Sequence, residues 1–282
     1  MSYQIEIIMQ TETLSEKTLI IYCFVDDFLK KIKPSDDKQR RFTDAQVITT
    51  AIIAAKKFYG NYASALDFLA SYEGFYRIDR AVFSMRLKRL EATIRLIFNH
   101  LCQTIKELNL SQEYIIDTFP VSGCRNIRIH YCRLIQGEPY RGYNVCKKEY
   151  FYGFKVQVIT TKEGVPVQFD IFCGETSDIT ALQSTQVNLP KNSQLFGDKA
   201  YNDYEIEDFM YECDEIMLRP IRKSNSKRKD FPYEVAYKKM IRKQIENSFT
   251  QITDLLPKHI HATNIEAFLL KIFLFVLACT IL

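Results

Sequence analysis

Residues 150–172 read YFYGFKVQVITTKEGVPVQFDIF, and this stretch decides the fold. Runs of β-branched and aromatic residues on either side of Lys162-Glu163-Gly164 predict two strands, Tyr150–Thr161 and Val165–Phe172, joined by a hairpin turn. Upstream, Tyr114–Val121 (YIIDTFPV) has the same character and predicts an earlier strand. The three strands together indicate a meander at the start of a domain.

Short helices and strands alternate after this meander. The predicted helices are Ile179–Thr185, Tyr204–Cys213 and Tyr233–Leu255, and the predicted strands are Gln194–Gly197 and Glu215–Arg219. Three strands followed by alternating helix and strand is the element order of the ribonuclease H-like fold. We therefore expect an α/β (α+β) domain with a mixed five-stranded sheet flanked by helices.

Residues 1–110 read as a separate all-helical domain, because apolar residues recur there at spacings of three and four. The predicted helices are Leu14–Lys31, Asp44–Phe58, Ala63–Ser71 and Arg80–Leu108, with Thr43 and Asn61 as helix-start residues. Such helices occur in DNA-binding helix-turn-helix domains and also in bundles without that role, so DNA contact by this domain stays open.

The second predicted domain, with the ribonuclease H-like order of elements, is expected to span residues 111–282. It ends in the apolar stretch Ala267–Leu282, which is interrupted by Lys271 and is shorter than the roughly 20 residues that a membrane-spanning helix needs. We expect a buried terminal helix there. The first residues lack the basic start and apolar run of a signal peptide, so we expect a cytoplasmic protein.

The composition is that of a globular protein, with 47% hydrophobic and 26% charged residues. The eight cysteines form no CxxC pair, which predicts reduced and mostly buried thiols. Cys124, His130, Cys132 and Cys146 lie in a basic region, but their spacing is not that of a standard zinc finger.

Two aspartates stand out in the predicted sheet. Asp117 interrupts an apolar strand, where a carboxylate is costly unless a cation or hydrogen bonds compensate it, and Asp198 follows the fourth strand. Each alone also fits an exposed strand end or a turn. In a ribonuclease H-like sheet, however, the first and fourth strands are neighbours, which would bring the two carboxylates together as a site for Mg²⁺.

Glu246 lies on the predicted helix Tyr233–Leu255, where it could simply pair with Arg242 four residues earlier. As a third ligand it would complete a site for two Mg²⁺ or Mn²⁺ ions about 3.5–4 Å apart. One ion would activate water or a DNA 3′-hydroxyl, and the other would stabilise the leaving oxygen of a phosphoryl transfer. Asp117, Asp198 and Glu246 are the candidate catalytic and metal-binding residues.

Positive charge is concentrated around these acids. Ten lysines and arginines oppose two acids between Arg219 and Lys243, and seven oppose two between Arg125 and Lys155. One such stretch is ordinary solvated surface, but two of them flanking candidate catalytic acids indicate a phosphate backbone as partner. The candidate DNA-binding residues are Arg128, Arg141, Lys147, Lys148, Lys155, Lys199, Arg222, Lys223, Lys227, Arg228, Lys229 and Arg242.

Several segments, in order, resemble those of the DDE transposases of bacterial insertion sequences, most closely the group numbered nine hundred eighty-two. Ile116–Val121 resembles the segment of the first aspartate, Gly197-Asp198-Lys199-Ala200-Tyr201 that of the second, and Ile245–Phe249 that of the glutamate. Three further segments are similar to the family's: Cys124–Ile129, Gly153–Lys155 and His259–Ala262.

The resemblance implies cleavage at the ends of an insertion sequence and transfer of the 3′-hydroxyl into target DNA. It also implies double-stranded DNA as partner, a nucleoid-associated location in the cytoplasm, no membrane association, and a homodimer or larger assembly on DNA. Arg242 is similar to the arginine that accompanies the glutamate in related transposases and helps to hold DNA. Ala200 departs from the usual glycine, and Thr253 stands where some relatives carry a lysine.

Two alternatives stay open at this stage. One is a catalytically inactive or domesticated DNA-binding protein that keeps the fold. The other is a ribonuclease H-like nuclease that cleaves DNA without strand transfer.

Overall fold

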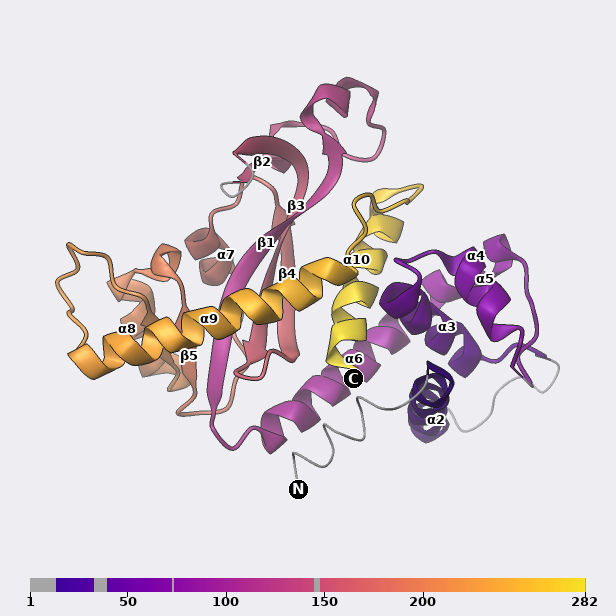
Figure 1. The fold of residues 1–282 in the computed structure, drawn as a ribbon, viewed down its shortest axis with the longest axis horizontal. Coiled ribbons are helices and arrows are strands. Elements are labelled where there is room, and N and C mark those ends of the chain that lie inside the picture. Colours follow the sequence, from indigo (N-terminus) through magenta and orange to yellow (C-terminus); the bar gives the residue numbers. More distant parts are fainter. Residues whose placement is uncertain (1–13, 33–39, 73, 145–147, 282) are drawn as a thin grey trace. The chain divides into compact units, whose positions relative to one another are not determined.

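The computed structural model describes residues 14–32, 40–72, 74–144 and 148–281 (Figure 1). The chain divides into two compact units. We call residues 1–100, 255–257 and 266–282 the helical unit, and residues 101–254 and 258–265 the sheet unit.

The helical unit is built from helices. Its helices before the sheet are α2 (Leu14–Ile32), α3 (Asp44–Lys57), α4 (Tyr62–Leu69), α5 (Arg80–Arg89) and the first part of α6 (Glu91–Leu108). α3, α4 and α5 each start at a residue whose side chain caps the helix. Thr43 starts α3 in a capping box with Gln46, and Asn61 caps α4, which confirms both predicted helix-start residues.

The prediction of one continuous helix from Arg80 to Leu108 is wrong. The chain leaves helical geometry at Leu90, where φ is −90° and ψ is 1°, and α6 begins at the next residue. Neither a glycine nor a proline stands at this break, so the usual sequence signal for a helix end is missing.

The C-terminal helix α10 (Ile265–Thr280) belongs, from Glu266 onward, to the helical unit. Phe273 is buried and packs edge-on against Phe98, with ring centroids 5.6 Å apart. Lys56 Nζ donates to the carbonyl oxygens of Ala278 at 3.3 Å and Ile281 at 2.5 Å, which satisfies the end of the helix. The predicted buried terminal helix is confirmed, and within the helical unit it packs with the N-terminal helices.

Among the described residues, no helix combines the length and the apolar character that crossing a bilayer requires.

The sheet unit holds a six-stranded mixed sheet. Its strands are β1 (Glu113–Arg125), β2 (Arg141–Asn144), β3 (Glu149–Thr161), β4 (Pro166–Cys173), β5 (Gln194–Gly197) and β6 (Met217–Pro220). They follow the order β2-β3-β1-β5-β6, with β4 also paired to β3. β3 runs antiparallel to β1, β2 and β4, whereas β5 is parallel to both β1 and β6.

This topology is the ribonuclease H-like fold predicted from the element order. The count of five strands is wrong, because β2 adds a sixth. β2 is only four residues long, and its sequence RGYN lacks the alternation of apolar and polar residues that would predict a strand. Short 3₁₀ helices complete the connections: η1 (Asn126–Tyr131), η2 (Glu138–Tyr140) and η3 (Lys199–Tyr201).

Helices cover both faces of the sheet. On one face, Tyr114 and Ile116 of β1 form a core with residues of α7 (Asp178–Ser184) and α8 (Tyr204–Asp214). α9 (Pro232–Leu255) crosses the other face (Figure 1). Its Tyr237 packs on Phe196 of β5 and its Phe249 packs on Phe119 of β1. Because successive strand residues point to opposite faces, Asp117 shares the α9 face with Phe119.

We predict that Phe273→Ala destabilises the helical unit by about 3–5 kcal/mol, since it removes a fully buried ring and leaves a cavity. Urea denaturation followed by circular dichroism measures the change. Leu96→Ala on α6 is the matched control, because Leu96 is 53% exposed and its loss should change stability by no more than about 0.5 kcal/mol. Equal effects of the two substitutions would contradict the packing role of α10.

Candidate active site

Parallel pairing of β1 with β5 brings two aspartates together. Ile115 lies opposite Phe196 in the register of these strands. Asp117 and Asp198 each follow two residues later, so they occupy equivalent positions on neighbouring chain segments and share one face of the sheet. The expected neighbourhood of the first and fourth predicted strands is thereby confirmed.

The backbone around Asp198 is shaped by a tight turn. Asp198 caps η3, and its Oδ1 accepts the N–H of Ala200 at 2.7 Å. Gly197 is required before it, because a Cβ at that position would lie 2.7 Å from the ring of Tyr201. Ala200 is not among the residues with positive φ, so alanine is accommodated there without backbone strain.

Both aspartates carry poorly compensated negative charge. Burial raises the pKa of Asp117 to about 7 against the opposing effect of the Thr118 N–H, which donates to its Oδ1 at 2.8 Å. The charges of Asp198 and Asp178 raise the pKa of Asp117 further. Burial also raises the pKa of Asp198, again with Asp178 contributing. A pair of half-buried carboxylates with this surplus charge is suited electrostatically to a cation.

α9 brings a positive charge to the pair. Arg242 lowers the pKa of both Asp117 and Asp198, which places its guanidinium within electrostatic reach of each. Glu246, one turn later, is 65% exposed and accepts from Arg242 Nε at 3.3 Å. Phe249, three residues further, packs on Phe119 of β1.

Glu246 therefore lies between Arg242, whose charge acts on both aspartates, and Phe249, which packs on β1. The Glu246 carboxylate itself pairs with Arg242. Within the described part of the chain, no three His, Cys, Asp or Glu residues are gathered closely enough to hold a metal ion. The structure places Asp117 and Asp198 at neighbouring positions, and among the described residues Glu246 does not join them in one ligand set.

A third aspartate, Asp178, was missed by the sequence reasoning. Its carboxylate accepts the hydroxyl of Thr118 at 2.5 Å and pairs with Lys155 Nζ at 3.4 Å. Ser177 caps α7 directly before it, so the sequence shows only an ordinary helix start. The one signal available was an acid closely following the third strand of the meander.

The candidate DNA-binding residues fall into groups. Arg141 pairs with Glu138 at 3.5 Å and lies over the ring of Tyr150 at 4.5 Å. Lys223 is exposed, and its positive charge lowers the pKa of Asp198. Lys147 lies outside the described residues. The remaining exposed candidates are Arg128, Lys148, Lys199, Lys227 and Lys229.

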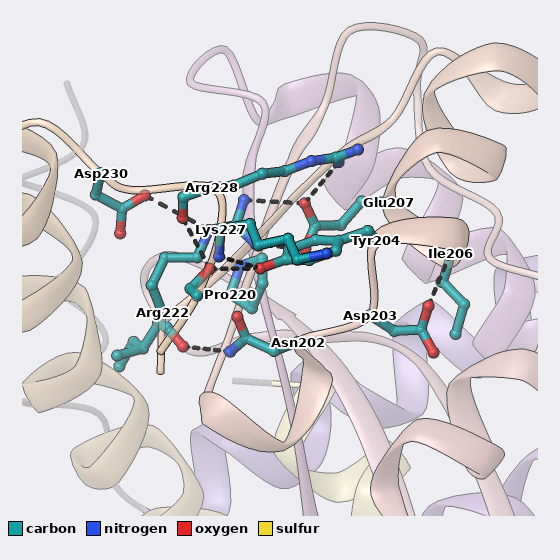
Figure 2. Close-up of polar contacts among 12 residues, drawn as sticks. Asn202, Asp203, Tyr204, Ile206, Glu207, Pro220, Arg222, Lys227, Arg228 and Asp230 are labelled. Carbon is teal, nitrogen blue, oxygen red and sulfur yellow. Dashed lines mark hydrogen bonds and ion pairs between the residues drawn. The ribbon is translucent and has the colours of Figure 1, made fainter. Parts of the chain in front are cut away.

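Two arginines of the basic segment are engaged within the protein (Figure 2). Arg222 binds Glu207 through both terminal nitrogens, at 2.5 and 2.9 Å. Arg228 binds Asp208 in the same two-pronged manner, at 2.8 and 2.7 Å. Their charges, which the sequence assigned to DNA, are paired with acids of α8.

The described cysteines are free thiols, as predicted, but the expectation that most are buried is wrong. Of those seven only Cys102 is buried, and Cys146 lies outside the described residues. Cys124, Cys132 and His130 belong to no metal-binding group of the described chain.

Comparison with known proteins identifies the family. Residues 109–281 match the model of the transposase DDE domain, a region that contains all six strands and the three candidate acids. The chain has no match among curated proteins and none among solved structures. The matched region is more than half of the chain, and the chain therefore belongs to the family of transposases with a DDE domain.

Proposed function

We propose that this transposase cleaves DNA at the ends of an insertion sequence of the group numbered nine hundred eighty-two and joins the resulting 3′-hydroxyl to target DNA. The observation that carries the proposal is the pair Asp117 and Asp198, held at equivalent positions of parallel neighbours with surplus negative charge. Asp117, Asp198 and Glu246 are the proposed catalytic and metal-binding residues.

The donor set fits a hard divalent cation. Mg²⁺ and Mn²⁺ prefer oxygen ligands, and the two aspartates offer carboxylate oxygens whose burial disfavours the uncompensated charge. We propose that the Glu246 carboxylate leaves Arg242 and joins the two aspartates as a metal ligand. This change would free the Arg242 guanidinium for a DNA phosphate. Two bound ions would supply activation of the attacking oxygen and stabilisation of the leaving one.

DNA is the proposed partner of the sheet unit around this site. Lys199 and Lys223 are exposed close to Asp198, and Lys227 and Lys229 follow in the same basic segment. Such lysines would neutralise backbone phosphates and release counterions. Residues 1–110 remain a proposed second DNA-contacting domain, and pairing of two DNA ends calls for at least two protomers.

Incubation with Mg²⁺ and labelled DNA carrying the ends of the protein's own element tests the function. Joined product supports transposition, cleavage without joining supports the nuclease, and binding alone supports an inactive protein. Inverted repeats found in the DNA on either side of the reading frame would supply the substrate sequence.

We predict that Asp117→Asn lowers strand cleavage by roughly two to three orders of magnitude or more, because it removes a charged ligand at the point where charge develops. DNA affinity, measured by fluorescence anisotropy, should be nearly unchanged. Asp214→Asn, at the exposed end of α8, is the matched control and should retain full cleavage. Wild-type cleavage by Asp117→Asn would overturn the proposed site.

Asp117 should also make stability depend on pH when no divalent metal is present. Its folded pKa of about 7 lies above the value near 4 of an unfolded aspartate, so the free energy of unfolding falls as pH rises from about 4 to about 7. Asp117→Asn removes this loss and should be the more stable protein at pH 8, by on the order of 1–3 kcal/mol.

Thermal unfolding at pH 4.5 and pH 8 measures this difference, which should shrink at the lower pH. Added Mn²⁺ should raise the melting temperature of the wild type at pH 8 and have little effect on Asp117→Asn. The account fails if the two proteins show parallel pH profiles and the same response to Mn²⁺.

A further inference from the structure

The basic loop, residues 221–231, joins β6 to α9 and begins beside the aspartate pair. The backbone N–H of Ile221 donates to the carbonyl oxygen of Gly197 at 3.0 Å, directly before Asp198. The side-chain amide of Asn202 donates to the carbonyl oxygen of Ile221 at 2.5 Å. The start of the loop is therefore tied to the same turn that presents Asp198.

The middle of the loop is held by one tyrosine of α8 (Figure 2). The Tyr204 hydroxyl accepts the backbone N–H of Lys227 at 2.8 Å and shares a hydrogen bond of 2.7 Å with Ser226 Oγ. The guanidinium groups of Arg228 and Arg222 lie over the Tyr204 ring, 4.8 and 5.9 Å from its centre. A single side chain thus contacts the loop through both its ring and its hydroxyl.

A buried carboxylate completes the attachment. The Glu207 side chain is only 7% exposed, and it accepts from Arg222 through both oxygens and from Arg228 Nη1 at 3.3 Å. Arg222 itself is 16% exposed and also lies 3.7 Å from Asp230. Loss of one partner from such a group leaves a desolvated charge unpaired, so the loop cannot leave α8 without cost.

The geometry points to a positioning role: Glu207 and Tyr204 clasp the basic loop to α8, so that Arg222 and Arg228 hold the loop in place while its lysines face DNA next to Asp198. This inference rests on the proposed function, since it names what presents the cations to the DNA backbone. The exposed cations that the clasp leaves for phosphates are Lys223, Lys227 and Lys229.

If the clasp holds the loop, loss of the Glu207 charge should change DNA affinity in the direction opposite to that expected from charge alone. Removing an acid next to DNA should strengthen binding if charge alone matters. Glu207→Gln should instead weaken the binding of an end-containing duplex about fivefold, because the loop is released. The matched control Glu205→Gln removes the same charge from an exposed residue of α8 and should bind as tightly as the wild type or slightly more tightly.

Tyr204→Phe tests the clasp without any change of charge at neutral pH. It deletes the hydroxyl that holds Lys227 and Ser226, and it should also weaken DNA binding, with a folded circular dichroism spectrum. It serves as the second variant should Glu207→Gln fail to fold. In both variants trypsin should cleave after Lys223, Lys227 or Lys229 several times faster than in the wild type.

The outcomes separate the clasp from the proposed function. Failure of the wild type to bind duplex DNA would contradict the proposed function. Faster cleavage of the loop by trypsin in Tyr204→Phe would still support the clasp. Binding by both variants at least as tight as by Glu205→Gln, together with unchanged trypsin cleavage, would overturn the positioning role.

Discussion

The parallel pairing of β1 with β5 is the constraint on which the rest of the sheet unit depends. It places Asp117 and Asp198 at equivalent positions, although 80 residues stand between them in the sequence. Two half-buried carboxylates on neighbouring chain segments repel each other and lose hydration, so nearby groups must compensate their negative charge. Arg242 lowers the pKa of both aspartates and Lys223 lowers that of Asp198, so these two side chains are part of that compensation.

α9 supplies a positive charge that compensates the two aspartates. The helix is fixed on the sheet by Tyr237 against Phe196 and by Phe249 against Phe119. Between these two contacts, Arg242 faces the aspartates and Glu246 pairs with Arg242. A cation at the aspartate pair and a guanidinium in reach of it compete for the same negative charge. The proposed release of Glu246 by Arg242 follows from this competition.

Local pattern was enough to predict most of the fold. Alternating β-branched and aromatic residues defined the meander, and element order alone predicted that β1 and β5 would be neighbours. β2 could not be predicted, because an edge strand such as RGYN is stabilised by its partner β3 and not by its own composition. The packing of α10 with the N-terminal helices is likewise a contact between distant segments, which no local pattern records.

The candidate site was harder to predict where charges pair across the sequence. Arg222 and Arg228 look like free cations in a basic stretch, yet acids of α8, 15 or more positions earlier, neutralise both. The charge left on the loop is then carried by lysines, whose ammonium groups bind phosphate as point charges. Under the proposed function, the loop would hold the DNA backbone at the aspartates without choosing its sequence. Under the same proposal, recognition of the element's ends falls to other parts of the protein, and Arg128 and Arg141 of the sheet unit and the helical unit are the places to look for it.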